Sequence, residues 1–149
     1  FMQESTYNTY NSDGILTSTI RSTMTTYNDQ QDQATFSHPI ITSYADNQPT
    51  WHITALHGNS SKNNTAIKLW GKVKFHRLAT DEAPATVITT TESMIYPKQS
   101  LAKTDQPVTI TQLKSIAHGT GMTADLKNGN YSLLSQSKGE YIPPEQPTK

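Results

Sequence analysis

Five histidines are the residues of this chain best suited to bind a metal ion or to transfer a proton. Metal ions need imidazole or carboxylate ligands that converge in space, and neighbouring ligands usually follow compact spacings in the sequence. His52 and His57 are five residues apart across the end of an expected strand, which matches no such spacing. We therefore expect isolated surface histidines and no metal site. The five are His38, His52, His57, His76 and His118.

Nucleophilic and acid–base catalysis also lack a recognisable motif. The chain has no cysteine, which excludes a thiolate nucleophile, a thiolate metal site and a disulfide. No serine lies in the G-x-S-x-G turn of the hydrolases. A carboxylate pair for sugar cleavage is a spatial pattern, and the acidic residues fall mainly in loop-like segments. These are Asp13, Asp29, Asp32, Asp46, Asp81 and Glu82. We expect no catalytic residues, no cofactor and no enzymatic activity.

The charge balance disfavours a polyanionic partner. Lys and Arg number 12, as do Asp and Glu, so the formal net charge is 0, whereas nucleic-acid-binding domains usually carry a basic surface. Lys68, Lys72 and Lys74 share one face of an expected strand. We expect that face to be a solvated outer surface, with contact to phosphates as the alternative. No run of about 18 apolar residues occurs, so the sequence contains no expected membrane-spanning helix.

The elements that must position any site are predicted to be strands. Apolar residues recur at every second position from Trp51 to Ala55 and again from Ile67 to Phe75, which is the period of half-buried strands. The best helical candidate, residues 100–103, is too short to stand alone. Asn128-Gly129 predicts a β-hairpin. Turn-rich segments at 28–33, 57–64, 78–85 and 97–106 separate the apolar runs. The pattern predicts an all-β sandwich, barrel or jelly roll.

One apolar face of these strands is the candidate site. A core is the simplest role for such a face. However, Gly71 leaves volume in the middle of one strand, and Ser18, Ser22 and Ala55 are small where a packed core would use bulk. The face therefore either forms a closed core or receives a linear apolar guest. We predict that its inward residues are Leu16, Ile20, Phe36, Ile40, Trp51, Ile53, Leu69, Val73, Ile88, Val108, Ile110 and Met122.

The order of several short motifs resembles the LptC family. The LptA bridge proteins share its fold and the strand–G-x-V pattern, but the first and last motifs favour LptC. Together the motifs extend over about residues 7–141. They are Tyr10-Asn11-Ser12-Asp13-Gly14, Phe36-x-x-Pro39, Trp51-x-Ile53-x-Ala55, Leu69-x-Gly71-x-Val73, Ile88-Thr89-Thr90, Asp105-Gln106-Pro107-Val108 and Gly119-Thr120-Gly121-Met122-x-Ala124-Asp125.

The resemblance implies a fold and a location. LptC is the bitopic inner-membrane component of the bacterial lipopolysaccharide export machine. Its periplasmic domain is an open, twisted antiparallel β-jelly roll with an apolar concave interior. On this basis residues 1–142 form a single domain, residues 143–149 form a flexible Pro-rich tail, and a single-pass transmembrane anchor precedes the sequence. The protein would then lie at the periplasmic face of the inner membrane.

The resemblance also implies partners. Lipid A acyl chains of lipopolysaccharide would enter the interior, where Phe36 aligns with an aromatic residue that lines the lipid path. The inner-membrane complex of LptB, LptF and LptG would contact the anchor and the N-terminal edge, near Ser5. LptA would pair with the C-terminal edge, and the isolated domain could dimerise through its open edges. The residues expected at the C-terminal edge are Gly121, Tyr131, Leu133 and Tyr141.

Three alternatives to such a lipid carrier stay open. The first is an LptA-like bridge protein. The second is a structural docking module with a closed core, whose edges assemble the export complex. The third is a secreted carbohydrate-binding or carbohydrate-degrading jelly roll, which needs an exposed row of aromatic residues. Tyr7, Tyr10, Tyr27 and Tyr44 are scattered along the chain and give that last function little support.

Overall fold

The computed structural model describes residues 2–28, 30, 33–45, 48–61, 65–80, 84–113 and 115–136. These residues form strands and one short 3₁₀ helix, so the all-β prediction is confirmed. The elements are β1 (Met2–Tyr10), β2 (Leu16–Asn28), β3 (Gln33–Ser37), β4 (Ile40–Ala45), β5 (Gln48–Thr54), β6 (His57–Ser60), β7 (Ile67–Arg77), β8 (Thr86–Tyr96), η2 (Pro97–Gln99), β9 (Leu101–Gln112), β10 (Ser115–Asp125) and β11 (Asn130–Gln136).

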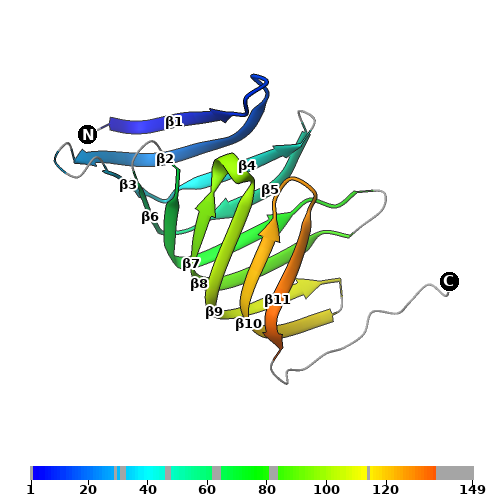
Figure 1. The fold of residues 1–149 in the computed structure, drawn as a ribbon. Helices are drawn as coiled ribbons and strands as arrows, with labels where there is room; N and C mark the ends of the chain where they lie inside the picture. Colours follow the sequence, from blue (N-terminus) through cyan, green and yellow to red (C-terminus); the bar gives the residue numbers. More distant parts are fainter. Residues whose placement is uncertain are drawn as a thin grey trace.

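The strands form one antiparallel sheet that follows the order of the chain. β3 and β4 both pair with β2, and β5 and β6 both pair with β7, so each couple acts as one long strand with a break in the middle. Pairing of β3 with β6 and of β4 with β5 joins the two couples. The result is a simple meander with β1 at one edge and β11 at the other (Figure 1).

A crease crosses the strands near their middle and folds this sheet in two. The pairing register shifts within β7, β8 and β10, and β3–β4 and β5–β6 break at the same level. Backbone φ values of 50° at His38, 85° at Gly71, 52° at Lys72 and 80° at Gly121 mark the line. Such bulges bend strands and increase their twist. The open jelly-roll prediction is thus confirmed, and its physical cause is this crease.

The crease defines two halves that face each other. We call them half A and half B. In Figure 1, β11 and the adjoining parts of β9 and β10, which belong to half B, cross in front of β7 and β8. Half A contains β4, β5 and the segments 16–21, 73–77, 86–90, 108–112 and 115–120. Half B contains β3, β6, β11 and the segments 24–28, 67–70, 93–96, 101–104 and 122–125.

The core lies between the halves and is built from rows of side chains that are directly opposite across neighbouring strands. In half A one row is apolar throughout: Ile20, Ile41, Ile53, Phe75, Ile88, Ile110 and Ala117. The facing row of half B has smaller members: Ala34, Ser60, Ile67, Ile95, Ala102 and Ala124. Because each row runs across the strands, the apolar interior extends from the β1 edge towards the β11 edge.

Two of three local predictions change with the structure. The predicted loop at 57–64 begins with a strand, β6, because β3 and β7 flank it and take up its hydrogen bonds. The short helical candidate at 100–103 lies in β9 for the same reason, since β8 and β10 pair on both sides. The hairpin at Asn128-Gly129 is confirmed between β10 and β11. The predicted tail lies outside the described residues.

Candidate functional site

The predicted apolar face lines the interior between the two halves. Ten of the twelve predicted residues are at most 5% exposed, and Leu16 is half-buried at the end of β2. The ten are Ile20, Phe36, Trp51, Ile53, Leu69, Val73, Ile88, Val108, Ile110 and Met122. They come from both halves, so the fold brings together residues up to about a hundred positions apart in the chain.

The inward assignment of Ile40 is wrong. Its side chain is 41% exposed, whereas that of Ile41 is 1% exposed and lies opposite Ile20 and Ile53. The left-handed φ of His38, followed by Pro39, shifts the alternation by one residue where the chain crosses the crease. Sequence alternation alone does not reveal such a shift.

Gly71 does not leave free volume in this face, contrary to the prediction. It lies in the crease with a φ of 85°, and a Cβ placed there would meet the Leu56 Cβ at 2.9 Å. Ser22 also belongs to the crease: its Oγ donates to the Met24 carbonyl at 2.8 Å. Both small residues therefore serve the bend of the sheet, and they do not form a groove.

A second row, on the side of half A farthest from the crease, is polar. Its members follow each other in register: Ser18, Ser43, Trp51, Arg77, Thr86, Gln112 and Ser115. We call it the rim row, because it borders the opening between the two halves on the side away from the crease. We call this opening the mouth. Sequence reasoning placed Trp51 and the small Ser18 on the inward face, and identified no polar row. The signal is the cross-strand register, which is invisible until the strand pairings are known.

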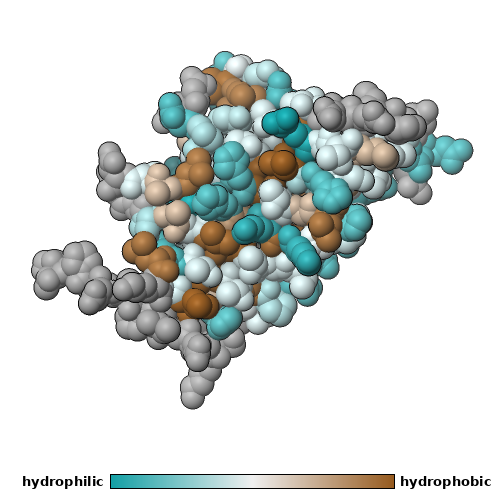
Figure 2. Space-filling model, turned by 180° about the vertical axis from the view of Figure 1, so that it is seen from behind, coloured by the Kyte–Doolittle hydropathy of each residue, from teal (hydrophilic) through white to brown (hydrophobic). Residues whose placement is uncertain are grey.

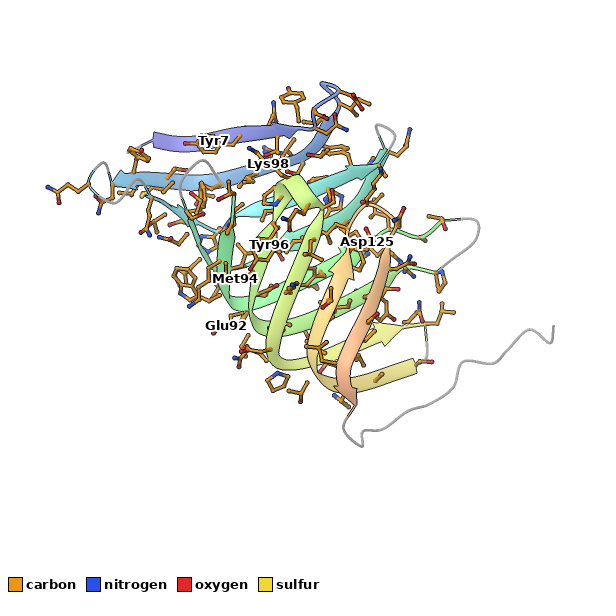
Figure 3. All side chains as sticks on the ribbon, in the orientation of Figure 1. Tyr7, Glu92, Met94, Tyr96, Lys98 and Asp125 are labelled. Atoms are coloured by element: carbon orange, nitrogen blue, oxygen red, sulfur yellow. The ribbon has the colours of Figure 1, made fainter. Side chains whose placement is uncertain are left out.

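Two parts next to half B, the turn at 126–129 and η2, cover the mouth. The turn at 126–129 joins β10 to β11, and its Leu126 is 2% exposed. Thr50 Oγ1 donates to the Leu126 carbonyl at 2.9 Å, and Arg77 Nη1 donates to the Gly129 carbonyl at 2.7 Å. The Leu126 N–H donates to the carbonyl of Ser100, directly after η2, at 2.8 Å. Figure 3 shows Lys98 of η2 beside β2 and Asp125 at the tip of β10.

Asp125 holds this turn in shape. Its carboxylate accepts hydrogen bonds from the backbone N–H groups of Lys127 and Asn128 and from the Asn128 side chain. Partial burial by itself raises the pKa of the Asp125 carboxyl. The hydrogen bonds from Asn128 and Lys127, with the Lys127 charge, outweigh that effect and lower the pKa below 3.8. The turn is therefore fixed internally by hydrogen bonds to Asp125.

The predicted C-terminal edge lies on β11, which pairs only with β10 among the described strands. Tyr131 and Leu133 pack against the core, whereas Leu134 points outward and is 67% exposed. Gly121 is buried in β10 with a φ of 80°, and a Cβ there would meet Leu134 Cδ1 at 2.8 Å. Tyr141 lies outside the described residues.

The outer surface offers no competing site within the described part of the chain. Lys68, Lys72 and Lys74 are exposed, as predicted for a solvated face, and Lys68 forms an ion pair with Glu92 at 3.7 Å. No three His, Asp or Glu side chains converge among the described residues. Figure 2 shows hydrophobic side chains in separate patches among polar ones on the face seen from behind. No helix in the described segments is long and apolar enough to cross a membrane.

A folded antiparallel sheet with an apolar interior and two open edges defines the LptA-like class of β-jelly rolls. The fold is similar to that of LptH, the LptA homologue from Pseudomonas aeruginosa, described as a periplasmic component of the lipopolysaccharide transport device. The TM-score is 0.60 at 10% sequence identity, covering 83% of this chain and 92% of LptH. Residues 1–142 match the family described as "Lipopolysaccharide-assembly, LptC-related", so the chain belongs to the LptC family. No curated protein sequence matches it.

Family membership confirms the resemblance found in the motifs and assigns the chain to lipopolysaccharide transport. It also fits a component of the cell envelope rather than a metabolic enzyme. The roles still to be assigned are those of the residues that contact lipid and of the edges that meet other proteins. Those roles depend on the geometry of the interior and the edges.

Proposed function

We propose that this chain is a non-enzymatic carrier that receives lipid A acyl chains between its two halves and passes them on along the sheet. The observation that supports this most is the direction of the apolar rows. They run across the strands, from β2 or β3 to β10, next to the edge strands β1 and β11, and the two edge strands each pair on one side only among the described strands. A lipid that moves along these rows, with its acyl chains directed across them towards the crease, would keep those chains on an apolar surface.

The energetics suit a carrier. Burial of one methylene group contributes about 0.8 kcal/mol, so a chain of roughly a dozen carbons contributes on the order of 10 kcal/mol. Release into water would therefore be very slow. Transfer into a similar interior is nearly balanced, because the same burial is regained there. Such a carrier needs no catalytic group of its own, and an ATPase elsewhere in the pathway sets the direction.

The edges supply the continuity that transfer requires. An unpaired edge strand can accept a strand from another protein, which extends both the sheet and its inner rows. We assign β1 to the inner-membrane complex of LptB, LptF and LptG, with a single-pass anchor preceding the domain. We assign β11 to an LptA-like bridge protein. Gly121→Arg is expected to weaken that contact, because its side chain would displace Leu134 from β10.

A docking module with a closed core is the second candidate. Burial favours it, since ten predicted lipid-contacting residues are at most 5% exposed. Under this alternative the edges bind partners as described above, but no lipid ever enters. The carrier proposal instead requires the two halves to separate at the mouth, where two hydrogen bonds and the buried Leu126 side chain hold the turn at 126–129 to half A.

The experiment places a photo-crosslinking amino acid at Phe36 or Ile53 in the full-length protein in cells and probes for lipopolysaccharide adducts. The same amino acid at Ile40 is the matched control, because Ile40 is on the outer face of half A. Adducts at Phe36 and Ile53 that require the transporter's ATPase, with none at Ile40, support the carrier. Absence of adducts at both inner positions in folded, membrane-inserted protein favours the docking module.

A further inference from the structure

The rim row contains every buried side-chain nitrogen or oxygen atom that lacks a hydrogen-bond partner among the described residues. These atoms are Ser18 Oγ, Trp51 Nε1, Arg77 Nε and Ser115 Oγ. Ser18, Trp51 and Ser115 are 4%, 0% and 8% exposed, so water does not compensate them freely. A buried donor without an acceptor costs free energy, and native proteins normally avoid it. Four such atoms in one row indicate that an acceptor is expected there.

Arg77 adds charge to the same row. Its guanidinium donates to the carbonyls of Gly129 and Pro84 and to Thr86 Oγ1. All three acceptors are neutral, and no carboxylate within the described segments forms an ion pair with Arg77. A hollow of about 830 Å³ borders Arg77 between residues 48–50 and 127–130. The row thus has free donors, a cation without an ion-pair partner among the described residues, and space beside Arg77.

We propose that the rim row binds the oxygen acceptors at the head of an acylated lipid, namely its ester or amide carbonyls and its phosphate. This inference rests on the carrier function proposed above and adds the part of the lipid that the apolar rows do not contact. The all-apolar row of half A lies two residues further along each strand, a distance of about 7 Å. A lipid whose chains lie on that row places its carbonyl groups at the rim row.

The turn at 126–129 supports the same assignment, because it already presents acceptors of this kind to the mouth. The Gly129 carbonyl accepts from Arg77, and the Leu126 carbonyl accepts from Thr50. Both are peptide carbonyls, chemically close to the amide carbonyls of an acylated amino sugar. Lipid oxygens would replace these carbonyls at the rim when the turn moves away, so the turn covers the site until lipid arrives.

The test separates lipid affinity from stability. Ser18→Ala with Ser115→Ala, and separately Trp51→Phe, remove donors that have no partner in the free protein. For the serine pair we expect an unchanged or higher Tm, because two unsatisfied buried groups are removed. Trp51→Phe also deletes buried volume, since Trp51 is 0% exposed, and is expected to lower the Tm, so the comparison of stability with binding uses the serine pair. Ser18 and Ser115 lie at opposite ends of the row, six strand spacings apart, so the double variant removes one donor from each end. Binding of purified lipid A is expected to weaken several-fold, since a lipid bound at either end loses about one hydrogen bond. Lipid A binding is measured by quenching of the intrinsic tryptophan fluorescence for the serine pair and by calorimetry for Trp51→Phe.

Thr42→Val is the matched control. Thr42 is next to Ser43 but faces outward, and its Oγ1 lies 3.1 Å from His52 Nδ1. Its loss is expected to lower the Tm and to leave lipid A binding unchanged. Rim variants that bind lipid A like the wild type, or a serine pair that loses stability and binding in parallel, overturn the proposal. If the wild-type protein binds no lipid at all, both the carrier function and the rim site are overturned.

Phosphatidylethanolamine vesicles distinguish the two sources of this chemistry. Equal losses of lipid A and phospholipid binding in the rim variants support a site for acylated lipids in general. A loss confined to lipid A supports recognition of the acylated sugar. A wild-type protein that binds lipid A, with rim variants that keep full affinity for it, overturns the rim site but leaves the carrier function standing.

Discussion

The two halves of the sheet face the same interior with different chemistry. Half A presents an unbroken row of large apolar side chains and, beside it, a polar row with unpartnered donors. Half B presents a row with smaller members beside the large side chains of Phe36, Leu69 and Met122, and two of its inward hydroxyl groups have acceptors. Ser93 Oγ donates to the Lys103 carbonyl at 2.9 Å, and Thr104 Oγ1 donates to the Glu92 carbonyl. These polar groups of half B therefore have hydrogen-bond partners in the folded protein, whereas the rim row of half A has donors without one.

This difference suggests that the two halves have different roles in binding lipid. A surface with unpartnered donors is ready to bind a ligand, and a surface with small, satisfied side chains can cover a ligand of varied shape. Half B also supplies both parts that close the mouth, η2 and the turn at 126–129. We infer that half A recognises the lipid while half B moves over it. The crease between them must then be stable enough to keep both halves in register.

The largest expected effect is a charge in the apolar row of half A. Ile41→Asp would bury a carboxylate without a partner, at a cost of about 4 kcal/mol or more. Ile40→Asp is the matched control on the outer face and should cost no more than about 0.5 kcal/mol. Urea unfolding measures both. Equal costs for the two variants would mean that the alternation in β4 has been assigned to the wrong face, and the contrast between the halves would lose its basis.

The crease is tested by three glycines with similar φ values and different surroundings. Gly14, Gly71 and Gly121 have φ values of 80°, 85° and 80°. Alanine at Gly14 meets no atom within 4 Å, so its cost of roughly 1–2 kcal/mol reflects the backbone alone. Alanine at Gly71 also meets the Leu56 Cβ, which cannot rotate away, so about 1–3 kcal/mol more is expected.

Gly121→Ala should cost more than Gly14→Ala and slightly less than Gly71→Ala. Its closest contact, Leu134 Cδ1 at 2.8 Å, can move, but Leu134 Cβ at 3.0 Å cannot rotate away. Thermal unfolding of all three variants gives the order. Equal costs at the three positions would show that the crease imposes no contact of its own. In that case the halves could shift relative to each other, and the in-register rows would not be fixed.

Much of this architecture was predictable from the sequence. Period-two alternation placed ten of the twelve expected residues inside, because an alternating strand with one buried face has a single solution in each regular stretch. The Asn128-Gly129 turn was equally predictable from its residue types. The errors at Ile40, Gly71 and residues 57–60 all lie at the crease, where bulges reset the alternation. A bulge depends on the neighbouring strands as well as on the local sequence, so it was not predictable from either strand alone.

The rim row could not be predicted from the sequence, for a different reason. Its members, such as Ser18 and Ser115, are almost a hundred positions apart and have no motif in common. They become a site only when seven strand segments align in register, and their missing hydrogen bonds are a property of the folded state. Apolar rows leave a sequence signal because burial requires hydrophobicity. A row of donors does not, because serine, threonine and glutamine occur equally on an outer surface.

The smallest expected effect concerns the turn by which half B covers half A. The folded pKa of Asp125 lies below its ordinary value of 3.8, so its contribution to the turn is complete above that pH and is lost as the pH falls through the folded pKa. We expect amide exchange at Lys127 and Asn128 to accelerate over this acidic range. Asp125→Asn should exchange faster at neutral pH and lose this pH dependence. If both proteins respond to acid identically, Asp125 does not hold the turn, and the mouth must be closed by the contacts of Thr50 and Arg77 alone.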